Sequence, residues 1–256
     1  MAVLSVNLNK VALLRNARGA DQPSVTGAAR TVLAAGAHGI TVHPRPDQRH
    51  VRPDDVSELA TLLQTYPGIE YNIEGNPFAG PRDNGYPGFD ALIESAQPHQ
   101  ATLVPDTDNQ LTSDHGWDLA GDNRRLSESI KRYQAAGARV SLFMDPEHDQ
   151  IARARDVGAD RIELYTGPFA ETVSEFGLDD DASRASLARY EEAAAHAAGL
   201  GLGVNAGHDL DTHNLKLFRQ IEQVAEVSIG HALISDALDV GLTAAVRAYL
   251  EVLGHL

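Results

Sequence analysis

The segment at residues 38–50 brings together side chains that can bind an anion and transfer protons. Its apolar run, residues 39–42, ends at His43, and Arg45, Arg49 and His50 follow within a stretch that two prolines stiffen. Imidazole and guanidinium groups directly after a buried strand are typical of a site for an anionic substrate. The alternative is a strand end followed by a solvated basic loop, so the other strand ends must be considered.

Polar or ionisable side chains also lie at the ends of, or within, the other apolar runs of the chain. They are Asn7, Asn9 and Lys10; Glu70; Thr112, Asp114 and His115; Asp145; Glu163; Asn205 and His208; and Gly230 and His231. In a barrel of parallel strands the active site lies at the carboxyl ends of the strands. This distribution favours a functional site over surface decoration.

Two carboxylates lie inside predicted strands. An unpaired carboxylate is costly in a barrel, so Glu70 and Glu163 are each expected to be either ion-paired or functional. The structural alternative is an ion pair with Arg45 or Lys10.

Other polar residues each have two open interpretations. Gly230 and His231 precede a predicted helix, and this position in a barrel predicts a phosphate cradle made of backbone N–H groups. Lys10 fits either a Schiff-base lysine or a point charge that binds phosphate. Arg15 and Arg18 are either ordinary helix and loop cations or groups that reach over the barrel mouth.

No metal or bound cofactor is expected. His43, His208 and His231 can converge only through the fold, because no His-x-His or His-Glu-x-x-His spacing is present. The chain has no cysteine, which excludes thiolate ligands, thiolate chemistry and a disulfide framework.

The elements that must position these residues alternate along the chain. Short apolar runs predict strands at residues 3–7, 39–43, 69–73, 101–104, 139–144, 161–165, 201–205 and 226–230. Periodic stretches predict helices, among them residues 25–35, 54–64, 122–136, 147–157 and 182–198, and several end on glycine before the next strand. This order predicts a single (β/α)8 TIM barrel domain over residues 1–256, with additional helices. An open doubly wound sheet is the alternative, but no glycine-rich dinucleotide fingerprint follows any strand.

The overall charge limits the partners. A formal net charge of -15 argues against nucleic acid and against docking on an anionic membrane. The sequence shows neither a signal-peptide core nor an apolar run long enough to span a membrane. We therefore expect a cytoplasmic protein.

Eight stretches, in order and over essentially the whole chain, resemble the pyridoxine 5'-phosphate synthase family. They are VNLNKVALLRNARG, GITVHPRPDQRH, TLVPD, LTSDHGWD, VSLFMD, IELYTG, GLGVNAGHDL and SIGHALI. The resemblance implies a (β/α)8 barrel with additional helices and a homo-octamer built from dimers. It also implies condensation of 1-deoxy-D-xylulose 5-phosphate with 3-amino-2-oxopropyl phosphate to pyridoxine 5'-phosphate, inorganic phosphate and water.

The resemblance further implies roles at matching positions. His43 and Glu70 match proton acceptors, and His208 matches the proton donor. Glu163 matches the residue that stabilises the transition state. The remaining matches are Asn7, Arg18, Asp209, Gly230 and His231 around the aminoketone phosphate, Arg45, His50 and Thr112 around deoxyxylulose phosphate, and Asn9 and Lys10 at a substrate contact.

The chain departs from the usual family pattern in places. Asn9 and Lys10 stand where the family usually has Asp-His, and Asp209 stands where glycine is common. We interpret the chain as a subfamily variant, in which Lys10 still serves as a phosphate cation. Two alternatives stay open: another phosphosugar-acting barrel enzyme, such as an isomerase, epimerase or Schiff-base aldolase, and a non-catalytic sensor of phosphorylated metabolites.

Overall fold

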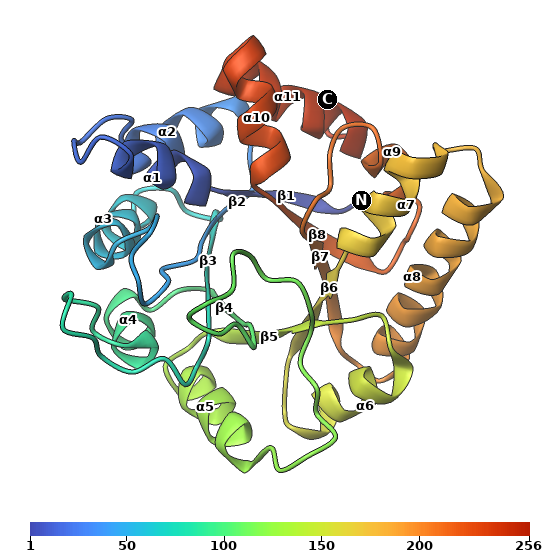
Figure 1. Ribbon diagram of the computed structural model, residues 1–256, viewed down its shortest axis with the longest axis horizontal. Helices are drawn as coiled ribbons and strands as arrows, with labels where there is room; N and C mark the ends of the chain where they lie inside the picture. The colour runs from blue at the N-terminus through green and yellow to red at the C-terminus, as the bar shows by residue number, and fades with distance from the viewer.

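Eight parallel strands close into a barrel in the computed structural model, which describes all 256 residues (Figure 1). The strands are β1 (Val3–Asn7), β2 (Gly39–Val42), β3 (Glu70–Gly75), β4 (Gln100–Leu103), β5 (Arg139–Met144), β6 (Arg161–Tyr165), β7 (Gly203–Gly207) and β8 (Val224–Ile229). Each strand pairs with its neighbours in sequence, and β1 pairs with β8 to close the circle. The predicted (β/α)8 barrel is confirmed.

Helices surround the barrel. They are α1 (Asn9–Asn16), α2 (Val25–Ala35), α3 (Pro53–Leu63), α4 (Phe89–Ala96), α5 (Arg124–Ala135), α6 (His148–Asp156), α7 (Gly167–Phe176), α8 (Asp181–Gly199), α9 (Leu215–Phe218), α10 (His231–Val240) and α11 (Leu242–Leu253). Local sequence sets their ends. The Ser24 hydroxyl accepts a hydrogen bond from the Gly27 N–H at the start of α2, and Gly36 ends that helix at φ 111°.

The two faces of the barrel sheet differ in polarity. Alternate residues such as Leu4, Val6, Ile40 and Val42 are fully buried and belong to the apolar core. The intervening residues face the barrel interior and are mostly polar, which differs from the branched apolar layers of typical barrels. Buried examples are Ser5, Thr41, Asn72, Thr102, Ser141 and Asn205.

Cross-strand hydrogen bonds satisfy much of this polar interior. The Ser5 and Thr41 hydroxyls lie 2.7 Å apart, and Thr102 donates to the Asn72 side-chain oxygen at 3.0 Å. The interior therefore holds polar groups in fixed positions from one end of the barrel to the other.

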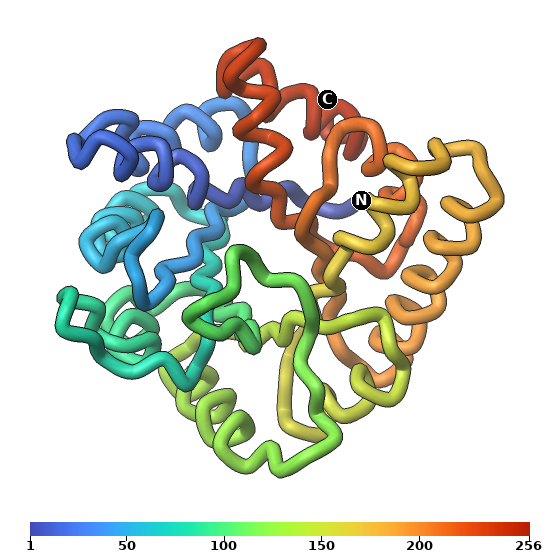
Figure 2. The backbone as a smooth tube through the Cα atoms, in the orientation of Figure 1, coloured from blue at the N-terminus to red at the C-terminus, as the bar shows by residue number.

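The segment between β4 and α5, residues 104–123, lies across the strands in the view of Figure 2, where it is green. We call it the β4–α5 loop. None of the helices combines the length and the apolar composition that a membrane crossing requires.

Candidate active site

His43 follows β2 directly and is buried. Its backbone N–H donates to the Asn9 side-chain oxygen at 2.8 Å, which ties the start of α1 to the end of β2. Burial, together with the nearby Arg45 and His50, lowers the pKa of His43 well below its usual value. The imidazole is therefore neutral at physiological pH and is able to accept a proton.

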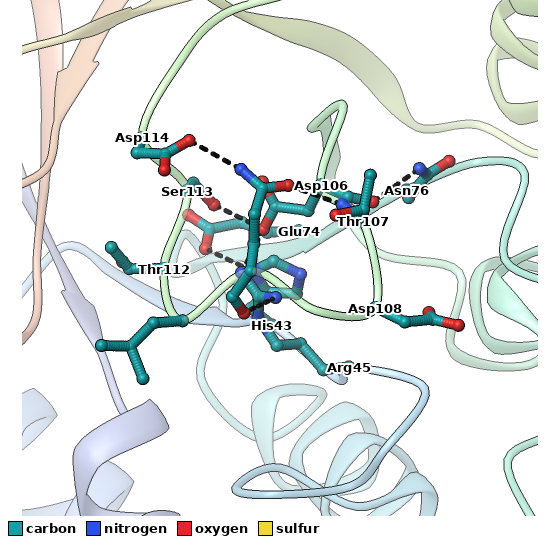
Figure 3. Close-up of polar contacts among 12 residues, drawn as sticks. His43, Arg45, Glu74, Asn76, Asp106, Thr107, Asp108, Thr112, Ser113 and Asp114 are labelled. Carbon is teal, nitrogen blue, oxygen red and sulfur yellow. Dashed lines mark hydrogen bonds and ion pairs between the residues drawn. The ribbon is translucent and has the colours of Figure 1, made fainter.

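Glu74 lies beside His43 at the carboxyl end of β3 (Figure 3). One of its carboxylate oxygens is 3.9 Å from His43 Nδ1 and accepts a hydrogen bond from the Asn7 amide at 3.2 Å. Burial raises the pKa of Glu74 to about 7. Sequence reasoning missed this residue, although alternation along the strand puts it on the same face as Glu70.

Glu70 lies at the other end of the barrel. It is the first residue of β3, in register with Gly39 at the start of β2. Its carboxylate forms an ion pair with Arg139, the first residue of β5. The expected placement of Glu70 among the groups at the mouth is wrong, and the ion-pair alternative holds with a different partner from those expected.

Glu163 is buried in the middle of β6. Its Oε2 has no hydrogen-bond partner, and Oε1 occupies the space that a side chain at position 207 would fill, where the chain has Gly207. Burial, with further contributions from Glu74 and Glu226, raises the pKa of Glu163 well above its usual value. A protonated carboxyl group here is a hydrogen-bond donor aimed into the barrel.

His208 follows β7 in a strained turn. Its φ is 85° and that of Asp209 is 58°, both in the left-handed region. A left-handed backbone is one that glycine adopts without strain, and here Asp209 occupies it. Asp209 Oδ2 lies 2.7 Å from His208 Nδ1, and this hydrogen bond lowers the pKa of Asp209.

The other nitrogen of His208 contacts the β4–α5 loop. His208 Nε2 is 2.7 Å from the Thr112 hydroxyl, and the Tyr165 ring packs edge-on against the imidazole at 5.4 Å between centroids. The contact brings together Thr112 and His208, which are 96 residues apart in the sequence.

Arg45 and His50 are both buried close to His43. Arg45 forms an ion pair with Asp106 and donates to the Gln110 carbonyl at 3.1 Å. His50 Nδ1 accepts the Val51 N–H at 2.9 Å, so its proton resides on Nε2. Burial and Arg45 lower the pKa of His50 to about 3, so this residue contributes an N–H donor and no positive charge.

Arg49 holds the β4–α5 loop. Its guanidinium donates to the carbonyls of Gln110 at 2.9 Å, Leu111 at 3.2 Å and Asp108 at 3.3 Å. Arg49 is therefore bonded to this loop, and the alternative of a solvated basic loop does not describe it. Beside it, a cleft of about 250 Å³ opens next to His43.

The candidate phosphate cradle lies at the start of α10. Gly230 precedes the helix, His231 is its first residue, and the Asn7 side chain packs against Gly230. Lys10, in the first turn of α1, contributes to the electrostatic environment of both His50 and Asp209. The structure thus brings Asn7 and the cradle together.

Two arginines near the end of α1 differ in environment. Arg15 is buried and bonded to Asp55 and the His50 carbonyl, so it supports the segment that carries His50. Arg18 is exposed beyond the end of α1, and no side-chain bond joins it to another predicted site residue.

Comparison with known proteins identifies the family. The family described as "Pyridoxal phosphate biosynthesis protein PdxJ" matches residues 4–255. The chain belongs to this family. It is 56% identical over 251 residues to the "Pyridoxine 5'-phosphate synthase" of Xanthomonas campestris pv. campestris (strain B100), covering 98% of this chain and 95% of that protein. The Albidiferax ferrireducens protein of the same name is 54% identical over 250 residues, covering 97% and 96%. The resemblance inferred from the sequence motifs is confirmed.

More distant solved structures share the fold alone. The 3-hexulose-6-phosphate synthase of Salmonella typhimurium is 16% identical with a TM-score of 0.62, covering 99% of this chain and 100% of that one. KGPDC from Streptococcus mutans is 12% identical with the same TM-score, covering 99% and 97%.

Proposed function

We propose that this protein is a pyridoxine 5'-phosphate synthase of vitamin B6 biosynthesis. It condenses 1-deoxy-D-xylulose 5-phosphate with 3-amino-2-oxopropyl phosphate and releases inorganic phosphate and water. The observation that carries the proposal is the buried arrangement of neutral His43 beside protonatable carboxyl groups, in a chain that matches the PdxJ family over residues 4–255.

The chemistry requires repeated proton transfers. An amine adds to a ketone, water and phosphate leave, and a ring closes, so both acceptors and donors of protons are needed. His43 acts as a proton acceptor because it is buried and neutral. His208 acts as the donor, held in one orientation by Asp209 and Thr112. Glu163 stabilises developing negative charge by donating from its protonated carboxyl group.

Two groups of residues hold the two phosphorylated substrates. Around the aminoketone phosphate we place the helix start at Gly230 and His231, where free backbone N–H groups attract an anion. The other members of this group are Asn7, Arg18 and Asp209. Asn9 and Lys10 lie at the adjoining substrate contact, where Lys10 supplies positive charge.

Arg45, His50 and Thr112 bind deoxyxylulose phosphate. His50 contributes its Nε2–H, since its other nitrogen is already bonded. The guanidinium of Arg45 is engaged with Asp106, so substrate phosphate competes with or joins that ion pair. Metal ions and other cofactors have no role in this scheme.

We also propose that residues 1–256 act as one domain, that the protein works in the cytoplasm, and that it assembles as a homo-octamer. Exposed apolar residues support assembly: Leu238 is 75% exposed, Val240 60% and Leu14 53%. Such residues gathered on α10 and α1, which pack against each other, fit an interface between subunits.

The test is to supply both substrates to purified protein and to follow phosphate release and the absorbance of the pyridine product. Complementation of a vitamin B6 auxotroph gives the same answer in cells. His43→Asn should abolish both readouts. Absence of the pyridine product with wild-type protein would exclude the synthase. Borohydride trapping on Lys10 would then indicate an aldolase, and binding without turnover a sensor.

A further inference from the structure

We propose, resting on the function proposed above, that Asp209 is a positioning residue that sets the proton pattern of His208. The Asp209 carboxylate keeps one proton of His208 on Nδ1, so Nε2 is the nitrogen that exchanges a proton with substrate. It also stabilises the imidazolium form from which His208 donates. Asp209 thus acts on catalysis through His208, without contacting the reacting atoms.

The two ring nitrogens of His208 have different partners. Nδ1 lies beside Asp209 Oδ2, and Nε2 lies beside the Thr112 hydroxyl, each at 2.7 Å. Asp209 is ionised at neutral pH because the hydrogen bond from His208 lowers its pKa. An ionised carboxylate only accepts hydrogen bonds, so the proton between Asp209 and His208 belongs to Nδ1. Nε2 therefore accepts the Thr112 proton when His208 is neutral and donates when His208 is charged.

The turn that carries this pair is held in place by side chains from outside it. His208 and Asp209 both have a positive φ, and such a backbone persists in residues other than glycine where surrounding contacts impose it. The Thr166 hydroxyl donates to the Gly207 carbonyl at 2.7 Å, and the Asn214 side chain donates to the Asp209 carbonyl at 3.0 Å. The turn so held brings the side chains of two consecutive residues to hydrogen-bond distance.

The imidazole is fixed from three sides. Asp209 bonds one nitrogen, and Thr112, in the β4–α5 loop, bonds the other. The ring of Tyr165, the last residue of β6, packs edge-on against the imidazole. The ring of His208 cannot turn over to exchange its two nitrogens without breaking both hydrogen bonds. The position of each proton is therefore set by the fold.

The charged groups around the pair are of both signs. Asp209 interacts with Lys10 in α1 and with His231 at the start of α10, as well as with His208. Glu74 at the end of β3 interacts electrostatically with His208. The positive charge of Lys10 offsets that of the Asp209 carboxylate on the side of the phosphate cradle. A carboxylate is thus tolerated next to a site for an anionic substrate.

In the reaction the proton moves from His208 Nε2 to a substrate oxygen. The Nε2–H bond breaks as the O–H bond of the departing water forms, and the imidazolium becomes a neutral imidazole with its remaining proton on Nδ1. The His208 side chain is 23% exposed, so solvent can return a proton to Nε2. In serine proteases a carboxylate fixes the tautomer of the catalytic histidine in the same way.

The first measurement reads the tautomer of His208 and needs no substrate. In protein with ¹⁵N-labelled histidine, NMR gives separate chemical shifts for the two ring nitrogens, and comparison with His208→Gln assigns those of His208. Neutral His208 should carry its proton on Nδ1 in the wild type. In Asp209→Asn the side-chain amide can donate to Nδ1, so the proton should move to Nε2.

The second measurement separates kcat from KM in the synthase assay. Asp209→Asn should lower kcat on the order of 100-fold or more, because it favours the wrong tautomer. Asp209→Gly removes the carboxylate without imposing a tautomer and should lower kcat by only about tenfold. Glycine adopts this backbone without strain, so the Asp209→Gly variant should keep the circular dichroism spectrum of the wild type. KM for the aminoketone phosphate should stay within about threefold in both variants.

The matched control is Asp149→Asn, the same chemical change on the exposed side of α6, which should leave kcat within about twofold. If wild-type protein makes no pyridine product, the proposed function fails, and the tautomer alone decides whether Asp209 sets the proton pattern of His208. Neutral wild-type His208 with its proton on Nε2 would overturn the pairing. So would an active wild type whose Asp209→Asn variant keeps kcat within about threefold or changes KM alone, as a residue that only contacts phosphate would.

Discussion

The substitution Glu74→Gln should stabilise the protein at alkaline pH while it harms catalysis. Burial raises the pKa of Glu74 from 4.5 to about 7 in the folded protein. Below about pH 4.5 the folded and unfolded states both hold the proton, so Glu74 has no effect on the free energy of unfolding. Between the two values the folded state binds more protons than the unfolded state, so stability falls as pH rises. Above about pH 7 the folded protein carries the full free-energy penalty of burying the ionised Glu74 carboxylate.

The size of this penalty follows from the two pKa values. Their difference of about 2.5, at roughly 1.4 kcal/mol for each pH unit, gives about 3 kcal/mol. Glutamine keeps an oxygen that accepts the Asn7 hydrogen bond but carries no charge. For a chain of this length, about 3 kcal/mol corresponds to a rise in melting temperature of roughly 6 to 12 °C.

Thermal unfolding of wild type and Glu74→Gln at about pH 5 and about pH 8.5 tests the reasoning. The gain in melting temperature should be small at the lower pH and large at the higher one. Glu94→Gln, on the exposed face of α4, is the matched control and should shift neither value. An equal effect of Glu74→Gln at both pH values would refute a buried carboxyl group with a raised pKa.

Three further predictions concern the surroundings of the site. Asp55→Asn leaves the buried Arg15 guanidinium without its partner and should lower the free energy of unfolding by about 3–5 kcal/mol in urea titrations; a loss below about 1 kcal/mol would contradict this. Gly207→Ala introduces a β-carbon where Glu163 Oε1 lies, and should lower kcat/KM roughly tenfold or more with an unchanged circular dichroism spectrum. His50, with its pKa lowered to about 3, should show no NMR titration between about pH 5 and 8, whereas a midpoint near 6.5 would contradict its burial.

Much of the fold was predictable because it depends on local patterns. Apolar runs ending in polar groups and glycines closing helices located all eight strands, five of them to within one residue at each end. The largest shifts were at β3, β7 and β8. At β7 and β8, for example, the expected starts at residues 201 and 226 become Gly203 and Val224. Interstrand pairing determines these ends, and pairing partners lie far apart in the sequence.

The error over Glu70 has the same origin. The predicted strand ended at residue 73, whereas pairing of Glu74 with Thr102 and of Gly75 with Leu103 extends β3 beyond it. Because β3 ends two residues later than predicted, Glu74 and not Glu70 lies at its carboxyl end, at the mouth of the barrel. Glu70 is paired with Arg139, which is 69 residues away in the sequence, so no local pattern predicts the pair. Local sequence also could not predict the hydrogen bonds from Arg49 to the loop carbonyls, because every residue has a backbone carbonyl.

The polar barrel interior gives a physical criterion for separating structural from catalytic carboxylates. At the amino end of the barrel, the ion pair with Arg139 offsets the cost of burying the negative charge of Glu70. Glu226 lies near Arg139 and Arg161 without an ion pair, and burial, with Glu70 nearby, raises its pKa well above its usual value. No arginine forms an ion pair with Glu74 or Glu163, and their pKa values rise as burial predicts. A carboxylate that served only the fold would gain stability from a cation partner or from replacement by a neutral residue. Two buried carboxyl groups kept without such a partner, beside a neutral histidine, are therefore best explained by a need to exchange protons.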